Sequence, residues 1–500
     1  MRLHMHPISV LENIWKRLFL LLIPLIRGVA FIFSPEGFRA WLSGAWLDLL
    51  VILFILTASY INWRCKTYQV EANQLIIRTG VLIRRESCIP KKAIATLSES
   101  IPFYMRPFRA VRVYVDTDGG LAQRVDVKLT VREKDMPVLQ QLQDAKPVAP
   151  FLKRGYSPRW YEVAFMSICV SSALGSAVYA ALFIRQAGKI FGEDILELLR
   201  FRLEHAAEYL IFIPQTAAIL AIVILGLWFL GFMRNYLYYM KFSVYRQGDR
   251  LMLRHGLFVR SESVCRVNHI NFIDRRQNLL SRMFRLNMVF IQCTGYGKVQ
   301  QKMAAVIPAA TNKATRIYLK LLLPEFQETP VQIRPMRRSA VRYLWSPLAG
   351  ITAVIAVFYF ILPWLIPWLL PILSPTIAAF GVNLGAVWGE LIYFLGFMAV
   401  LPFIWMFILR LAGHGSAGIS VSETTLTLCY TKGFFIHTVI IPREKLNYVS
   451  FRRSIFQKAS GTCDLIFYTY SEYGHRHRVV SLPYEKAKTY LATQTDFPVL

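Results

Sequence analysis

The chain has 500 residues, of which 55% are hydrophobic, 14% aromatic and only 18% charged. Soluble proteins average about 25% charged residues, and the apolar excess here lies in long clusters, which excludes an ordinary soluble globular protein. The formal net charge of +28 favours an anionic partner, either nucleic acid or an acidic membrane surface. The seven cysteines lie far apart and form no Cys-x-x-Cys pair, which excludes a disulfide framework and a zinc ribbon.

Six apolar segments are long enough to cross a bilayer as helices, for which about 20 residues suffice. They occupy residues 15–34, 41–61, 160–184, 208–233, 343–372 and 386–411. Short loops join them into pairs, and a long polar stretch follows each pair. We therefore predict helix pairs within 1–61, 158–233 and 341–411, and polar domains at 62–150, 234–327 and 412–500.

The distribution of charge predicts which side of the membrane the domains occupy. Because an even number of spans precedes each polar domain, all three domains lie on one side. The loops within the pairs contain five Lys or Arg residues, whereas the membrane ends on the other side carry twelve. The positive-inside rule therefore places the three domains and both termini in the cytoplasm.

Three glycines mark an internal repeat. Gly80 and Gly256 are 176 residues apart, and Gly433 follows 177 residues later. Each lies in an alternating apolar pattern that predicts a β-hairpin, and we expect glycine there because a two-residue hairpin loop requires a positive φ. Further alternating strands and a terminal helix follow each hairpin. The sequence thus predicts three copies of a two-helix anchor joined to a small β-barrel with a C-terminal helix.

Several features of this repeat together resemble the bacterial pleckstrin-homology-like membrane proteins of the YdbS/YdbT type. They are the paired spans, the turn glycine, a second glycine-turned hairpin and a short helix centred on a basic residue. That basic residue is Arg106, Arg282 or Lys458 in the three copies. The three-copy arrangement is similar to the YdbT-like members of the family. The third copy departs most, because His437 stands where Arg84 and Arg260 stand in the others.

The resemblance implies an α+β membrane protein of the bacterial inner membrane. Six transmembrane helices would form three pairs, each followed by a cytoplasmic PH-like β-barrel domain with a C-terminal helix. The family has no catalytic signature, so the resemblance implies a non-enzymatic binding or scaffold protein without a cofactor. It also implies a smaller two-span PH-like membrane protein as a partner, and a role in envelope stress or in tolerance to antimicrobial peptides.

Basic residues are the candidates for binding anionic phospholipids or a partner. Residues 234–320 contain 16 Lys or Arg against 3 Asp or Glu, and each such cation near an anionic leaflet contributes about 1 kcal/mol. Three interpretations stay open: a solvated face that follows the positive-inside rule, a discrete headgroup pocket, and a protein-binding surface. The candidates are Arg254, Arg260, Arg266, Arg275, Arg276, Arg282 and Arg285 in the second copy, and Arg84, Arg85 and Arg106 in the first.

Two features inside the apolar segments support an alternative function. Arg27 interrupts the first segment, where an ionisable residue either marks a functional site, extends to the interface or lies at a re-entrant bend. Prolines recur every fourth residue from Pro363 and Pro367 onward, which predicts a kinked or broken fifth span. Broken spans line substrate sites in transporters, so the alternative is a transporter or lipid-handling protein. Residues 189–204 are typical of an amphipathic surface helix or of a folded loop.

The remaining motifs carry no chemistry. The sequence contains no phosphate-binding loop, dinucleotide fingerprint, zinc-protease motif or nucleophile elbow, so no catalytic and no metal-binding residues are expected. His475 and His477 have no cysteine or carboxylate at zinc-ligand spacing. Nucleic-acid binding is disfavoured because the basic residues follow the predicted topology. The oligomeric state and the ligand cannot be derived from the sequence.

Overall fold

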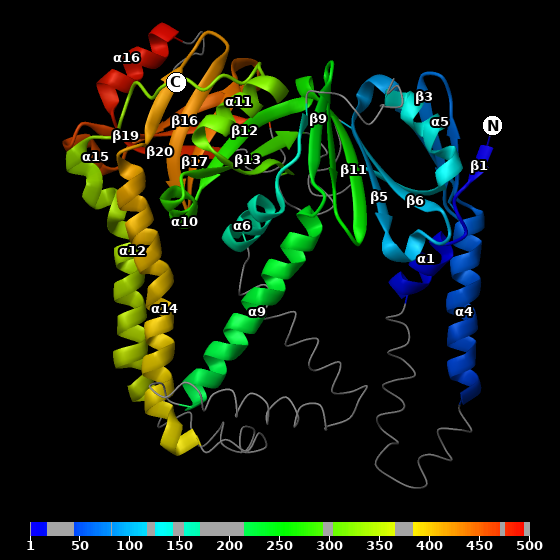
Figure 1. The fold of residues 1–500 in the computed structure, drawn as a ribbon, viewed down its shortest axis with the longest axis horizontal. Coiled ribbons are helices and arrows are strands. Elements are labelled where there is room, and N and C mark those ends of the chain that lie inside the picture. Colours follow the sequence, from blue (N-terminus) through cyan, green and yellow to red (C-terminus); the bar gives the residue numbers. More distant parts are fainter. Residues whose placement is uncertain are drawn as a thin grey trace. The chain divides into compact units, whose positions relative to one another are not determined.

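The computed structural model describes residues 2–17, 45–81, 83–117, 126–143, 155–170, 215–293, 304–365, 384–470 and 476–494. The chain divides into two compact units, each described by itself (Figure 1). The first unit contains Met1–Gly155, Lys241–Ile270 and Cys293–Met303, and the second contains Tyr156–Met240, Asn271–Gln292 and Ala304–Leu500.

The same order of elements recurs in each copy: three strands, a 3₁₀ turn, a long strand, a short helix, two strands and a terminal helix. Copy 1 contains β2 (Thr67–Val70), β3 (Gln74–Thr79), β4 (Arg85–Pro90), η2 (Lys91–Ala93), β5 (Ile94–Pro102), η3 (Phe103–Met105), β6 (Ala110–Thr117), β7 (Val127–Arg132), η4 (Glu133–Asp135), α5 (Met136–Gln140) and η5 (Gln141–Gln143). Copy 2 contains β9 (Ser243–Gln247), β10 (Arg250–His255), β11 (Val259–Arg266), η6 (Val267–His269), β12 (Ile270–Gln277), α10 (Leu279–Met283), β13 (Leu286–Cys293), β14 (Ala304–Thr311) and α11 (Asn312–Leu322). Copy 3 contains β15 (Gly418–Val421), β16 (Thr425–Lys432), β17 (Phe435–Pro442), η10 (Arg443–Lys445), β18 (Leu446–Arg452), α15 (Ile455–Ala459), β19 (Thr462–Thr469), β20 (Arg476–Pro483) and α16 (Tyr484–Gln494).

Sheets join neighbouring copies. In the first unit, β5 of copy 1 pairs antiparallel with β11 of copy 2, which gives a sheet of order β7-β6-β5-β11-β10-β9-β8, where β8 is Gly155–Tyr156. In the second unit, β12 pairs in the same way with β17 of copy 3, and the order is β14-β13-β12-β17-β16-β15. The second half of one copy therefore shares a sheet with the first half of the next. The two remaining sheets are β1-β2-β3-β4, which begins with β1 (Arg2–His4), and β18-β19-β20.

The core of copy 1 shows how the alternating pattern produces the domain. Tyr68, Leu75 and Leu97 point inward from β2, β3 and β5, and Val113 and Leu139 meet them from β6 and α5. Alternate residues of a strand face the same side, so these inward-facing apolar residues share one core. Burying each large apolar side chain contributes about 1.5–3 kcal/mol. The fold is thus a sheet-rich α+β fold, as predicted.

The turn glycines are equivalent in the three copies, as the repeat predicts, but the loops are not. Gly80, Gly256 and Gly433 have φ values of 111°, 100° and 58°. Only the third copy has a two-residue loop, between the paired residues Lys432 and Phe435. In the first two copies the paired strands end at Thr79 and His255 and resume at Arg85 and Ser261. The prediction of a two-residue loop was therefore wrong for copies 1 and 2, because the period of the apolar pattern does not fix where pairing stops.

Helices that are apolar, apart from the polar α1 and η8, precede most of the strands of each copy. They are α1 (Ser9–Arg17) and α4 (Ala45–Arg64), α6 (Trp160–Val170) and α9 (Gln215–Tyr239), and finally η8 (Arg337–Ser339), α12 (Ala340–Ile355), the π-helical η9 (Ala356–Ile361) and α14 (Leu384–His414). Within the described residues, one helix, Arg337–Leu365, has the length and composition to cross a membrane, and Leu49–Arg64 and Ala399–His414 are shorter apolar helices. Six spans are therefore a proposal, taken up below.

The predicted intramembrane residues are only partly within the described chain. Arg27, Pro367 and the segment 189–204 lie outside the described residues. Pro363 follows η9 in a helix that continues to Leu365. Proline donates no backbone hydrogen bond and its ring crowds the carbonyl four residues earlier, so the wider π-helical turn provides the space that this proline needs.

A basic pocket where α12 and α14 meet copy 3

A pocket of about 840 Å³ lies in the second unit, where α12 and α14 meet the strands of copy 3. The two helices run side by side to this end of the sheet (Figure 1). Of the described residues that line the pocket, six are cationic and none is Asp or Glu. The cations are Arg342, Arg410, Lys432, Arg452, Arg476 and Arg478.

Hydrogen bonds fix the helix ends to the domain. Tyr343 of α12 donates its hydroxyl to Thr431 Oγ1 at 2.8 Å and accepts from the Thr431 backbone N–H at 3.1 Å. Arg410, near the end of α14, donates to the backbone carbonyl of Tyr343 at 2.9 Å. Both helices are thereby held against β16, and the pocket is built on regular structure rather than on loops.

Asp464 on β19 does not line the pocket but holds two of the arginines that do. Its buried carboxylate accepts from Arg478 Nη2 at 2.5 Å, Gln457 Nε2 at 2.6 Å and Arg342 Nη2 at 3.0 Å, and from the Ser481 backbone N–H at 3.0 Å. Burial by itself would raise the pKa of this carboxyl, but the hydrogen bonds from Arg478, Ser481 and Gln457 outweigh burial and hold the pKa below its ordinary value. The carboxylate is therefore ionised at neutral pH and orients two of the guanidinium groups.

The arrangement suits an anion. One buried carboxylate neutralises one positive charge, so the pocket keeps a large positive excess. Lys432, Arg452 and Arg476 are exposed at its rim, where they can move to meet a ligand. Charge-assisted hydrogen bonds from guanidinium groups match the oxygens of a phosphate, often in pairs. Among the described residues no cluster of His, Cys, Asp and Glu could hold a metal ion.

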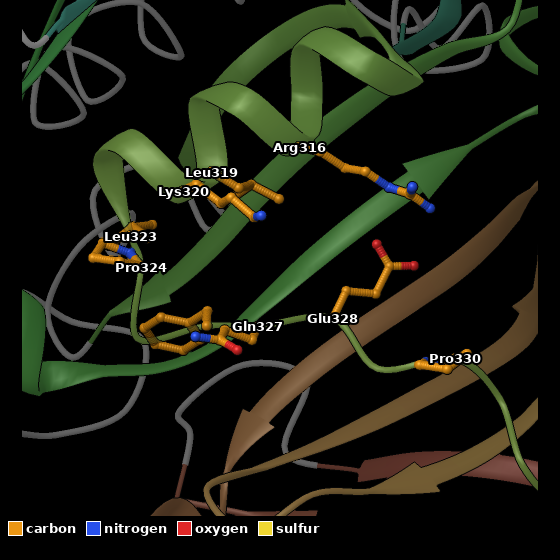
Figure 2. A pocket seen from close by; sticks show the side chains of 9 residues that line it. Arg316, Leu319, Lys320, Leu323, Pro324, Gln327, Glu328 and Pro330 are labelled. Atoms are coloured by element: carbon orange, nitrogen blue, oxygen red, sulfur yellow. The ribbon is translucent and has the colours of Figure 1, made fainter.

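A second pocket in the same unit, of about 710 Å³, is less suited to an anion. Arg316 and Lys320 of α11 line one side and Glu328 lies opposite Arg316 (Figure 2). Glu328 also forms a two-fold ion pair with Arg275, with distances of 2.7 and 2.9 Å. The lining is mixed in sign, so it offers no comparable positive field.

Several of the predicted headgroup-binding arginines form internal contacts instead. Arg254 pairs with Glu262 at 2.8 Å, and Arg106 donates to the backbone carbonyls of Leu257 and Phe258 at 2.5 and 3.2 Å. Arg275 is held by Glu328 as described. Arg84, Arg85, Arg260 and Arg285 are exposed, and Arg266 and Arg282 are half-buried.

Arg276 belongs to a buried cluster at the β12–β17 junction. Its Nε donates to Asp274 Oδ2 at 2.6 Å, and His437 Nδ1 lies 3.0 Å from the same oxygen. Burial would raise the pKa of the Asp274 carboxyl, but His437 and Arg276 outweigh it and hold the pKa well below its usual range. His437, which stands where arginines stand in the other copies, thus contributes to a strand junction.

The predicted arginines are divided between the two units. The first unit contains Arg84, Arg85, Arg106, Arg254, Arg260 and Arg266, and the second contains Arg275, Arg276, Arg282 and Arg285. None of them is among the described residues that line the two pockets. Sequence reasoning missed the basic pocket because it followed net charge, which is highest in copy 2. The missed signal was the pair of arginines that begins and ends the last helix pair, Arg342 and Arg410.

Three copies of a two-sheet, helix-ended domain, each preceded by apolar helices, define the class of membrane-associated PH-like proteins. The chain matches the family model for the bacterial PH domain over residues 18–146, 200–323 and 373–494, and it belongs to that family. It is similar to the UPF0699 transmembrane protein YdbT of Bacillus subtilis (strain 168), with 22% identity over 390 residues, which cover 72% of this chain and 77% of that relative. The predicted family and its internal repeat are confirmed.

Proposed function

We propose that this chain is a non-enzymatic, multi-pass protein of the bacterial inner membrane whose basic pocket in copy 3 binds the phosphate-bearing headgroup of an anionic phospholipid. The main observation behind this proposal is that six cationic residues and no Asp or Glu are found among the described residues that line the pocket. In this proposal six spans form three pairs, and the termini and the three PH-like domains are cytoplasmic.

The position of the pocket supports a lipid ligand. Arg342 lies near the start of α12 and Arg410 near the end of α14. Arg342 therefore directly precedes the predicted fifth span, and Arg410 lies at the end of the predicted sixth span. Trp345 also lines the pocket and is exposed, and tryptophan at a span end is typical of the membrane–water interface. In the proposed topology the pocket opens at the depth of the inner-leaflet headgroups. Each cation there contributes about 1 kcal/mol toward an anionic surface.

The exposed arginines of the first two copies would add a weaker, more diffuse attraction to the same leaflet. Arg84, Arg85, Arg260 and Arg285 are exposed, and exposed cations act within a Debye length of about 8 Å. A scaffold that senses anionic lipid would fit a role in envelope stress or in tolerance to antimicrobial peptides, with a smaller two-span PH-like protein as a partner.

One observation favours a second candidate, a transporter or lipid-handling protein. The π-helical turn η9 lies within the predicted fifth span and ends two residues before Pro363. Such turns occur often at functional sites. The test is flux or lipid transfer in proteoliposomes with Pro363→Ala, where an unchanged rate would count against this candidate.

The headgroup proposal is tested on the full-length protein in detergent. Phosphatidylglycerol should raise the melting temperature of the wild type, and phosphatidylcholine should not. The variant Lys432→Gln/Arg452→Gln/Arg476→Gln should lose most of that rise. The matched control Lys313→Gln/Lys486→Gln/Lys488→Gln removes the same charge from exposed positions on α11 and α16 and should keep it. An equal response of both triple variants would overturn the proposal.

A further inference from the structure

Each copy presents large apolar side chains on the short helix between its two halves. In copy 3, Ile455 and Phe456 of α15 are 84% and 85% exposed. In copy 2, Met283 and Phe284 at the end of α10 are 70% and 61% exposed. In copy 1, Phe103 of η3 and the nearby Phe108 are 62% and 61% exposed. Large apolar side chains are stabilised when they leave water. All three copies expose such side chains on this segment, at its start in copy 3, at its end in copy 2, and at the start of η3 and after its end in copy 1.

We call these three segments, η3, α10 and α15, the tips. The tips of copies 2 and 3 are capped at their first turn, which opposes fraying. Asn278 and Ser281 form a reciprocal capping box at α10, with distances of 2.7 and 2.8 Å. Ser454 and Gln457 do the same at α15, with distances of 3.0 and 3.3 Å. Gln457 is itself buried and bonded to Asp464. A capping box satisfies the first backbone N–H groups of a helix, and the apolar residues are therefore displayed on a fixed platform.

Each tip contacts the beginning of the helix pair that precedes its own domain. In copy 1, Met105 of η3 packs with Ile8, the residue before α1. In copy 2, the Phe284 ring lies edge-on to Phe165 of α6, with centroids 5.6 Å apart. In copy 3, the residue before α15 accepts a hydrogen bond from Arg342 of α12 at 3.0 Å. The exposed apolar residues therefore lie beside the points where the predicted first, third and fifth spans begin.

Cations flank the tips. Exposed basic residues adjoin the apolar ones in every copy: Arg106 and Arg109, Arg285, and Arg452 and Lys458. An apolar face bordered by Lys and Arg is the composition of segments that lie in the interface of an anionic membrane. If the occupant were a protein partner, there would be no reason for apolar and basic residues to occur together beside the start of three separate predicted spans.

We propose that the three short helices insert their outward apolar side chains into the interfacial region of the inner leaflet and hold the PH-like domains against it. The ligand is the bilayer surface, and the proposal rests on the six-span topology but not on the headgroup pocket. In copy 3 the insertion would place Phe456 among the upper acyl-chain carbons while Lys458 remains at the phosphates.

The test uses the full chain in vesicles of phosphatidylglycerol and phosphatidylethanolamine. Cys65, which is half-buried, and Cys88, which is exposed, are first replaced by serine. An environment-sensitive fluorophore is then attached at Phe456→Cys or, as a control, at Tyr470→Cys. Tyr470 is also a large exposed residue of copy 3, but it follows β19 at the end away from α15.

The label at position 456 should lose most of its fluorescence to acyl-brominated lipid and little to aqueous iodide, and the label at 470 should do the reverse. Met283→Cys should behave like position 456. Quenching of position 456 by iodide alone overturns the insertion. Protection from both quenchers also overturns it, because it identifies a protein as the occupant of the tip. Neither result would bear on the phosphatidylglycerol response of the pocket, so the two proposals fail separately.

Discussion

Glu99 of β5 lies directly opposite Glu262 of β11, in the strand pair that joins copy 1 to copy 2. Burial is the largest of the causes that raise the pKa of Glu99 to about 7, and the negative charge of Glu262 also raises it. A hydrogen bond from Gln140 at 3.0 Å lowers this pKa but does not outweigh the other two effects. Glu262 is paired with Arg254. Like charges directly opposite in a sheet are destabilising, so this junction carries a carboxyl that can be protonated near neutral pH.

The first prediction concerns the pH dependence of this junction. Because the folded pKa of Glu99 exceeds the ordinary value of about 4.3, protonation favours the folded junction, and stability is lost progressively as the pH rises from about 4 to 7. Glu99→Gln should remove this loss. Hydrogen exchange of the peptides covering β5 and β11, corrected for intrinsic rates, should show greater protection of the variant than of the wild type at pH 8 and equal protection near pH 4. Equal protection at both values would contradict the prediction.

The sequence could predict the copies but not how their sheets connect. Gly80, Gly256 and Gly433 identified equivalent hairpins because positive φ restricts the residue at such a turn. The pairings of β5 with β11 and of β12 with β17 could not be predicted. An alternating pattern predicts which face of a strand is buried. It does not predict the pairing partner, because any strand with an unpaired edge can hydrogen-bond to another strand.

The candidate site shows the same limit. Arg342, Arg410 and Arg478 are separated widely in the chain. They converge because α12 begins and α14 ends beside β16 and β20. In the sequence each was one more cation near a membrane end or on an alternating strand. The most basic copy drew attention to Arg254, Arg275 and Arg276, whose charges are largely matched by Glu262, Glu328 and Asp274. Net charge counts residues, whereas a site depends on which charges lack a nearby counter-charge.

The second prediction concerns Asp464. Asp464→Asn removes the negative charge that binds Arg342 and Arg478. The two guanidinium groups then lose their charged acceptor, so the free energy of unfolding should fall by about 2 kcal/mol. The folded pKa of Asp464 lies below its ordinary value of about 3.9. Its contribution is therefore present at neutral pH and is lost as the pH falls below about 4. Denaturant unfolding in detergent at pH 7 and pH 3.5 should show a smaller difference between variant and wild type at the lower pH.

The control for Asp464 is Glu485→Gln, which removes an exposed carboxylate from the first turn of α16. Exposed charges of this kind contribute at most about 1 kcal/mol. A loss of stability as large as that of Asp464→Asn would show that the net charge of copy 3, and not the buried network, is responsible.

The third prediction concerns a backbone conformation that recurs after the short helices. Arg109 and Arg285 have φ values of 50° and 53°, and the equivalent position in copy 3 is Gly461, with φ 65°. A left-handed conformation costs a residue with a Cβ atom about 1–2 kcal/mol. Arg285→Gly should therefore stabilise its unit by about 1 kcal/mol and Gly461→Ala should destabilise it similarly. Arg285→Lys, which keeps both charge and strain, should change the midpoint of denaturant unfolding little; a gain equal to that of Arg285→Gly would refute the backbone explanation.

The last prediction concerns the contact between α12 and α14. A Cβ atom built on Gly350 would clash with Cδ1 and Cε1 of the Phe403 ring, so the absence of a side chain allows the close approach of the two helices. Gly350→Ala should lower the melting temperature in detergent although alanine favours a helix by about 1 kcal/mol. Gly226→Ala on α9, where the added atom meets nothing within 4 Å, should not lower it. Phe403→Ala should destabilise the wild type but partly rescue Gly350→Ala, because the smaller side chain vacates the space that the new methyl group needs. Additive losses in the double variant would show that the ring and the glycine do not interact, and would contradict the packing described here.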